Sequence, residues 1–193
     1  MPGRALDNPL VVAILGLLLE SPMHPYQLWS ELAGRRKDPT VAVNRGSVYD
    51  LIKVLAAEEW IAVHGKARAG NRPTRTAYAL TPMGYDELVR RLDKQLRTPR
   101  PEYPQFLTAV SYVGAVGPDA AVDALTERAA ALRARIVDDE ARRAAALHQV
   151  PELFVIEAEY AVHMLRSELA WVIDLVERIR TGRLAWPTDK DRV

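Results

Sequence analysis

The 193-residue chain contains no cysteine, and this absence excludes disulfide bonds, thiolate metal sites and cysteine nucleophiles. It also lacks a long hydrophobic run. The longest run, residues 10–19, has about half of the roughly twenty apolar residues that a membrane-spanning helix needs, and no cleavage motif follows it. The sequence therefore predicts no membrane span and no targeting segment, and we expect a cytoplasmic location.

Neither sign of charge dominates, because 26 Lys and Arg residues stand against 25 Asp and Glu residues. This balance is too close to predict a nucleic-acid partner by itself. The distribution along the chain is more informative. Residues 1–97 hold 14 basic and 10 acidic residues, whereas residues 98–193 hold 12 and 15. The excess of positive charge in the N-terminal half indicates where a nucleic acid would bind.

Signatures of catalysis are also missing. The chain has no His-Glu-x-x-His motif, no nucleophile elbow and no glycine-rich phosphate loop, and its histidines are His24, His64, His148 and His163. Glu159 and His163 are four residues apart and could supply half of a metal site, although such helical pairs are more often surface contacts. We predict no enzymatic activity, no catalytic residue, no metal and no cofactor.

The most informative segment begins at Asn44 and has the apolar spacing of an amphipathic helix. Its apolar face consists of Val48, Leu51, Ile52 and Leu55. The first turns of a recognition helix meet base edges in the major groove, and their backbone N–H groups favour phosphate. We therefore predict DNA contacts for the polar residues of this helix, which are Asn44, Arg45, Ser47, Tyr49 and Lys53.

After Trp60 the apolar spacing changes from a helical period to a period of two, which is typical of strands. Ile61 and Val63 are predicted to face inward on the first strand. Tyr78 and Leu80 are predicted to face inward on the return strand. The segment is therefore interpreted as a hairpin with one apolar side.

The tip of this hairpin, residues 64–75, has four basic residues and no acidic residue, and Gly70-Asn71 suits a turn. A short basic loop taken alone is more often a solvated surface. Directly after a recognition-type helix, it is better interpreted as a wing that contacts DNA. The predicted contacts are Lys66, Arg68, Asn71, Arg72 and Arg75.

Two helices are predicted upstream. Asn8-Pro9 provides a cap and a first helical position for the apolar run, and Ser21-Pro22 stops it. In the next segment Leu28 and Leu32 are four residues apart, so one face packs on the first helix. Tyr26 lies at the start of this segment, and we predict that it touches a DNA phosphate.

Several stretches of the first half occur in a familiar order and spacing. They are Ile14-Leu15-Gly16-Leu17-Leu18 with Tyr26-Gln27-Leu28, Gly46-Ser47-Val48-Tyr49 followed by Ile52 and Leu55, and Tyr78-Ala79-Leu80-Thr81-Pro82-Met83-Gly84. Together they resemble the PadR-like transcriptional regulators. The resemblance implies a dimeric repressor whose third helix and wing bind a pseudo-palindromic operator, and whose C-terminal helices dimerise and sometimes hold a small effector.

The chain departs from this family pattern at two places. Pro25 stands where a glycine usually precedes the tyrosine of the second helix, and proline is well tolerated at the first position of a helix. Glu59-Trp60 stands where a glycine usually closes the recognition helix. The second departure removes a left-handed glycine cap and affects the direction in which the chain leaves the helix.

A proline-rich segment, Thr98 to Pro104, divides the chain. Its prolines cannot continue the helix that is predicted to begin near Thr81. We predict a winged helix-turn-helix domain over residues 1–98 and a helical domain over residues 99–193. The last helix of the second domain is predicted over about residues 151–180.

This last helix has two apolar stripes. A neighbouring helix of the same chain can cover one, and the other predicts a partner subunit, because an exposed apolar strip of that length promotes association. We assign to the dimer face Phe154, Ala158, Ala161, Leu165, Leu169, Val172, Val176 and Ile179. The second stripe contains Leu153, Ile156, Tyr160, Met164, Trp171 and Leu175. A monomeric bundle that covers both stripes is the alternative.

Aromatic residues of the second half could line a site for a small aromatic or apolar effector, since ligand sites favour apolar walls with a few polar groups. The candidates are Tyr103, Phe106, Tyr112, Tyr160 and Trp171. Their alternative role, as ordinary core or interface residues, stays open.

The fold predicted from these patterns is mainly α with a small β wing, in which an N-terminal winged helix-turn-helix precedes a C-terminal helical dimerisation domain. The predicted function is a sequence-specific, homodimeric DNA-binding repressor that a small molecule releases. Its expected partner is a pseudo-palindromic duplex operator, with no membrane partner. A winged helix that binds another protein, without DNA specificity, is the competing interpretation.

Overall fold

The structure is a computed structural model that describes residues 6–35, 44–67, 75–99 and 104–186. The chain divides into two compact units, residues 1–101 and 102–193. The boundary predicted after residue 98 falls in the same proline-rich segment as this division. Among the described residues, no helix combines the length and the apolar character that crossing a membrane requires.

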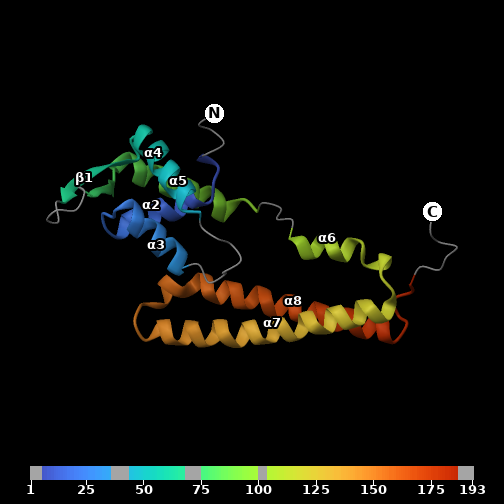
Figure 1. The fold of residues 1–193 in the computed structure, drawn as a ribbon. Coiled ribbons are helices and arrows are strands. Elements are labelled where there is room, and N and C mark those ends of the chain that lie inside the picture. Colours follow the sequence, from blue (N-terminus) through green and yellow to red (C-terminus); the bar gives the residue numbers. More distant parts are fainter. Residues whose placement is uncertain (1–5, 36–43, 68–74, 100–103, 187–193) are drawn as a thin grey trace. The chain divides into compact units, whose positions relative to one another are not determined.

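The first unit combines helices with a two-stranded hairpin (Figure 1). In chain order its elements are α2 (Leu10–Glu20), α3 (Pro25–Arg35), α4 (Arg45–Ala57), β1 (Ile61–Ala67), β2 (Arg75–Leu80) and α5 (Pro82–Arg97). A recognition-type helix followed by a hairpin is the arrangement of a winged helix-turn-helix. The predicted fold of the N-terminal half is therefore confirmed.

Helix α2 supplies much of the core of this unit. Its side chains Val11, Ile14 and Leu15 are completely buried, and the helix contacts α3, α5 and β2. Val48 and Leu55 of α4 are equally buried in the same cluster. Truncating buried aliphatic side chains costs about 2–5 kcal/mol, so this packing determines which face of α4 remains at the surface.

Both asparagines that the sequence places before helices act as caps. Asn8 Oδ1 accepts the backbone N–H of Leu10 at 2.9 Å, and Asn44 Oδ1 accepts that of Gly46 at 2.8 Å. Caps of this kind contribute about 1 kcal/mol each. The Asn44 cap fixes Arg45 as the first residue of α4.

Helix α4 ends without a glycine. Glu59 has a φ of 60°, in the left-handed region that favours glycine. Its N–H donates to the carbonyl of Ala56 at 3.1 Å, and the N–H of Trp60 donates to the carbonyl of Leu55 at 3.0 Å. These bonds form a Schellman motif with Glu59 at the left-handed position. The expected change of direction is therefore retained, but with backbone strain at Glu59.

The start of α5 holds this turn in place. Thr81 caps α5 by accepting the N–H of Gly84 at 3.0 Å, and its own hydroxyl donates to the Glu59 carbonyl at 2.7 Å. A Cβ at Gly84 would lie 2.0 Å from the carbonyl oxygen of Trp60. The absence of a side chain at Gly84 therefore lets α5 begin directly against the end of α4.

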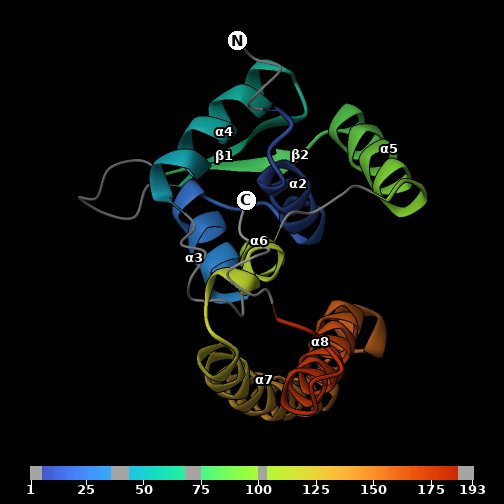
Figure 2. The same cartoon turned by 90° about the vertical axis from the view of Figure 1, so that its right-hand side faces the viewer.

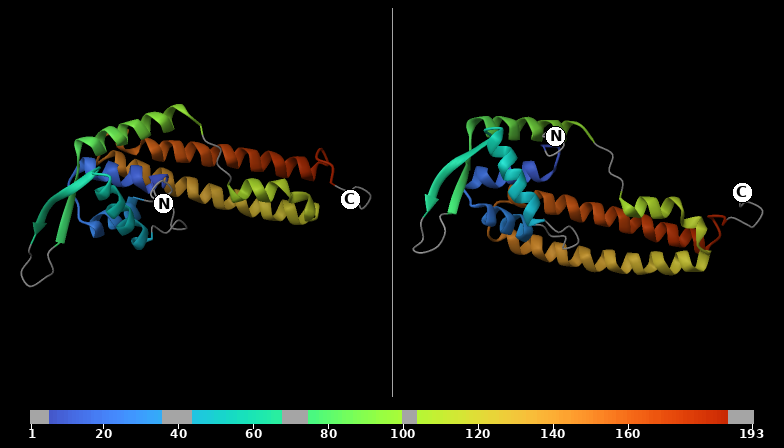
Figure 3. Two further views of the ribbon diagram at one scale, coloured as in Figure 1. Left: turned by 90° about the horizontal axis from the view of Figure 1, so that it is seen from above. Right: turned by 45° about the horizontal axis from the view of Figure 1, so that its top comes forward.

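The hairpin pairs Ile61 with Leu80 and Val63 with Tyr78 in antiparallel register. The predicted inward position of Val63 is wrong, because its side chain is 55% exposed whereas that of Ile61 is 2% exposed. The pairing is regular from Ile61 to Val63, and the register shifts only between Val63 and Gly65, so the shift does not explain the exposure of Val63. The hairpin also extends beyond the helices of its unit, so the core covers only its base (Figure 3).

The second unit contains a long helical hairpin. Helices α7 (Pro118–Leu147) and α8 (Ile156–Arg180) lie side by side, and the short helix α6 (Gln105–Ser111) precedes them (Figures 1 and 2). Two 3₁₀ turns, η1 (Val113–Ala115) and η2 (Glu152–Val155), precede α7 and α8. The last helix therefore begins about five residues later than predicted.

Apolar side chains join α7 to α8 along one line of contact. The core residues are Ala121, Leu125, Ala129 and Leu132 of α7 and Val172, Leu175 and Ile179 of α8. Arg128 of α7 pairs with Glu168 of α8, and its Cζ lies 3.6 Å from the centroid of the Phe106 ring. These contacts of Arg128 hold α6 against the helical hairpin.

Candidate nucleic-acid interface

The polar face of α4 is accessible because the opposite face is packed into the core. All residues predicted to contact DNA from this helix are exposed or half-buried: Asn44, Arg45, Ser47, Tyr49 and Lys53. Lys53 Nζ lies 3.0 Å from the carboxylate of Asp50, an exposed acid that the predicted site did not include. Exposed pairs of this kind contribute about 0–1 kcal/mol, so Asp50 does not fix Lys53 firmly.

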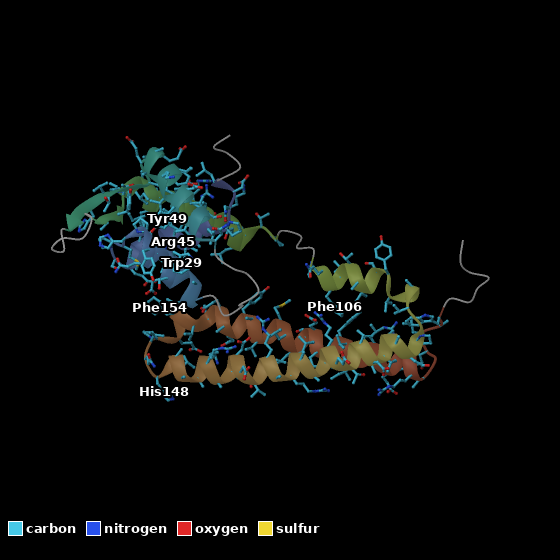
Figure 4. All side chains as sticks on the ribbon, in the orientation of Figure 1. Trp29, Arg45, Tyr49, Phe106, His148 and Phe154 are labelled. Atoms are coloured by element: carbon cyan, nitrogen blue, oxygen red, sulfur yellow. The ribbon has the colours of Figure 1, made fainter. Side chains whose placement is uncertain are left out.

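The guanidinium of Arg45 lies among aromatic rings (Figure 4). Its Cζ is 5.3 Å from the ring centroid of Tyr26, 5.4 Å from that of Tyr49 and 5.9 Å from that of Trp29. Arg45 Nη2 donates to the Tyr49 hydroxyl at 3.3 Å, and this hydrogen bond raises the pKa of the guanidinium. We call this arrangement the aromatic cage of Arg45.

Sequence reasoning missed Trp29 as part of this site. Tyr26 and Trp29 are three residues apart on α3, and their ring centroids are 5.5 Å apart. Helical spacing could have indicated that these two rings meet. It could not have indicated that Arg45, on the next helix, lies against them.

A groove of 580 Å³ opens beside the cage. The start of α3, the first turns of α4 and strand β2 line it with His24, Pro25, Tyr26, Arg45, Tyr49, Thr76 and Tyr78. None of these lining residues is acidic. His24 Nδ1 is buried there and has no hydrogen-bond partner within the described part of the chain. A guanidinium and several hydroxyl groups without a carboxylate form a surface that suits an anion.

The tip of the wing, with Arg68, Asn71 and Arg72, lies outside the described residues. Lys66 and Arg75 belong to the strands, where Lys66 lies opposite Thr76 and Arg75 lies opposite Ala67. The strands therefore carry both basic positions to the outer end of the hairpin. Contact of these wing residues with DNA stays a prediction.

The structure assigns the apolar stripes of α8 differently from the sequence. Ala158, Val172 and Ile179 are buried within the chain, and Val172 is 0% exposed. Their assignment to the dimer face is therefore wrong, because a side chain that its own chain covers cannot contact a partner. Leu165, Leu169 and Val176 pack partly against the same core, whereas Phe154 and Ala161 remain exposed.

The other apolar stripe lies at the surface of the second unit. The exposed side chains are Leu153, Ile156, Tyr160, Met164 and Trp171, while Leu175 is buried. The sequence argument for one covered and one uncovered stripe therefore holds in outline. The identity of the two stripes is largely exchanged, because periodicity alone does not say which stripe faces α7.

The aromatic residues proposed for an effector site do not gather in one place. Phe106 and Trp171 meet edge to face, with ring centroids 6.0 Å apart. Tyr160 precedes Trp171 by three turns of α8, or about 16 Å along the axis. Tyr112 is 73% exposed, and Tyr103 lies outside the described residues. The prediction of one pocket that contains all of these aromatics is therefore wrong.

A cavity of 750 Å³ lies between α7 and α8 near η2, and sequence reasoning missed most of its lining. Tyr160 and His163 contribute to it together with the apolar Leu147 and Ile156 and two ion pairs. The pairs are Arg143 with Glu159 and Arg166 with Glu140. Glu159 thus has an arginine partner, and the described residues contain no His, Asp and Glu cluster that could hold a metal.

Residues 14–90 match the family model of the transcriptional regulator PadR-like family. This range runs from α2 into α5 and includes the aromatic cage, the groove and the wing. A comparison with curated proteins gives no significant match.

Solved structures with the same fold span nearly the whole chain. Bacillus subtilis PadR in complex with operator DNA is similar at 19% identity and a TM-score of 0.75, covering 88% of this chain and 97% of that one. The same regulator in complex with p-coumaric acid is similar at 19% identity and a TM-score of 0.71, covering 89% and 98%. The PadR-like transcriptional regulator BC1756 from Bacillus cereus is similar at 14% identity and a TM-score of 0.62, covering 89% of this chain and 98% of that one. These likenesses confirm the fold.

Proposed function

We propose that this chain is a PadR-like transcriptional regulator, as the match of residues 14–90 to that family model supports, and that it represses transcription as a homodimer bound to a specific DNA sequence. One observation carries the proposal. At the start of α4, the capped helix presents Arg45 and Ser47 beside a groove that has no acidic residue. The start of a recognition helix is the part that meets base edges. As a member of this family, the chain would be a regulator rather than an enzyme. Such a regulator acts in the cytoplasm, where DNA is accessible.

Duplex DNA as the partner is supported by Bacillus subtilis PadR, whose structure contains operator DNA and whose fold this chain shares. The uncovered apolar stripe of α8 supports a homodimer, because a second copy would bury Ile156, Tyr160 and Met164. A symmetric dimer presents two recognition helices and therefore binds a pseudo-palindromic operator.

A small aromatic or apolar effector completes the proposal, and Bacillus subtilis PadR in complex with p-coumaric acid supports this class of ligand. The cavity between α7 and α8 is the candidate site, since Tyr160, Leu147 and Ile156 supply apolar walls and Arg143 a cation. A ligand that binds one dimer geometry preferentially would change DNA affinity by shifting the population. Binding of such a ligand would make the repressor dissociate from the operator, and transcription would then depend on the ligand concentration.

Selection of duplex fragments from a random pool tests the proposal. The full-length chain should enrich one pseudo-palindromic sequence, and its affinity for that duplex should fall as salt is raised. A scrambled duplex of equal length and composition is the control. Equal affinity for both duplexes, or no binding to either, would instead favour a winged helix that binds another protein.

A further inference from the structure

The groove beside Arg45 differs in charge from the cavity of the second unit. In that cavity each arginine has a carboxylate partner, so its charges balance. In the groove, Arg45 has no acidic partner among the described residues, and no lining residue is acidic. Hydroxyl groups of Tyr49 and Thr76 and the unpartnered Nδ1 of His24 complete its polar lining. The groove is thus an unbalanced positive site with hydrogen-bonding groups.

The cage limits what Arg45 can do. An arginine that reads a base must extend its guanidinium into the major groove. Doing so would give up the contacts with Tyr26, Trp29 and Tyr49 together with the hydrogen bond to the Tyr49 hydroxyl. Within the cage, the remaining N–H groups of Arg45 can donate to an anion without any movement of the side chain.

The elements around the groove indicate which anion it takes. Residues of helix α4 and of strand β2, which leads from the wing, both line the groove. We expect the start of α4 to enter the major groove and the wing to reach past its edge. A sugar–phosphate strand of the DNA would then pass between α4 and the wing, over the residues at which α4 and β2 come together. Those residues line the groove.

We propose that this groove holds one phosphate of the DNA backbone, and that Arg45 is a phosphate-positioning residue kept in place by its aromatic cage. This assignment rests on the proposed DNA-binding function and revises the role predicted for Arg45 from the sequence. Base recognition is then left to the other exposed residues at the start of α4, Ser47 among them. Phosphate contacts fix register on the duplex, whereas base contacts give specificity.

The test compares Arg45→Ala, Arg45→Lys and Tyr49→Phe with the unchanged chain, on the selected duplex and on its scrambled control, at several salt concentrations. Arg45→Ala should lower the affinity for both duplexes by the same factor, roughly tenfold, because a charge-assisted contact is lost. The salt slope should fall by about one. Arg45→Lys should keep the salt slope of the unchanged chain. Tyr49→Phe should lower the affinity for both duplexes slightly. Arg97→Ala removes an exposed charge from the end of α5 and should leave the slope unchanged.

If Arg45→Ala lowered the affinity for the selected duplex more than that for the scrambled duplex, Arg45 would read bases and the proposal would be overturned. Titration with inorganic phosphate at constant ionic strength separates a free anion from the DNA backbone. Saturable phosphate binding that Arg45→Ala removes, with DNA affinity unchanged, would also overturn it. If the unchanged chain bound no duplex, the proposed function itself would fail. Circular dichroism confirms that each variant is folded.

Discussion

The Thr81 hydroxyl donates to the backbone carbonyl of Glu59 at 2.7 Å, and it thereby joins the first turn of α5 to a non-glycine residue with a left-handed backbone. This bond closes the base of the wing, since β1 and β2 lie between the two residues in the chain. The direction of the wing thus depends on a strained residue that its neighbours hold in place.

Replacing Glu59 by glycine should stabilise the first unit by about 0.5–1 kcal/mol, because glycine adopts the left-handed conformation without strain but loses more entropy on folding. Urea unfolding of the full chain measures the change. Glu58→Gly is the matched control, because Glu58 has a φ of −81° and gains no relief, so that variant should be destabilised. Lower stability of Glu59→Gly would show that Glu59 is not strained.

Gly84→Ala should destabilise the first unit by about 3 kcal/mol, because the new Cβ would collide with the Trp60 carbonyl and force α5 away from α4. Thermal unfolding gives the measurement. Gly16→Ala on α2 is the control, since nothing lies within 4 Å of the added Cβ. It should leave stability unchanged or raise it by up to about 1 kcal/mol. Similar losses in both variants would contradict the role given to Gly84.

Ile156→Arg should weaken the dimer while the chain stays folded, because Ile156 is 52% exposed on the uncovered stripe of α8. Val172→Arg should instead disrupt the α7–α8 hairpin, since it buries an unpaired charge in the core. Sedimentation velocity and circular dichroism distinguish the two effects. A folded, dimeric Ile156→Arg variant would place the dimer interface elsewhere.

Changing both Arg68 and Arg72 in the wing to alanine should weaken binding to every duplex alike and lower the salt slope by roughly two. Ser47→Ala should alter which bases are preferred, because base contacts carry the specificity. Binding measurements over a series of salt concentrations and duplexes separate these results. An unchanged slope for the wing variant would show that the wing does not reach the DNA backbone.

Local patterns in the sequence predicted those features that neighbouring residues decide. Asn8 was predicted to cap a helix and does so through an atom two residues away, and the apolar spacing of α4 identified its buried face. The order of helix, hairpin and helix followed from the change of period after Trp60. These features depend on backbone geometry and burial within one element.

The features that sequence reasoning missed depend on contacts between distant elements. The cage joins Arg45 to rings on α3, and the buried stripe of α8 is chosen by its fit to α7. Val63 has the alternation of an inward residue and pairs in regular register with Tyr78, but the core of the unit does not cover it. Periodicity identifies apolar faces, whereas packing decides which of them is covered.

Sedimentation equilibrium of the full-length chain with its selected duplex tests the central claim most directly. With both half-sites present, two chains should bind each duplex at submicromolar concentration. A duplex with one half-site scrambled should bind far more weakly, since the two linked contacts act together. One chain bound tightly per duplex, with equal affinity when a half-site is scrambled, would contradict a homodimeric, sequence-specific regulator.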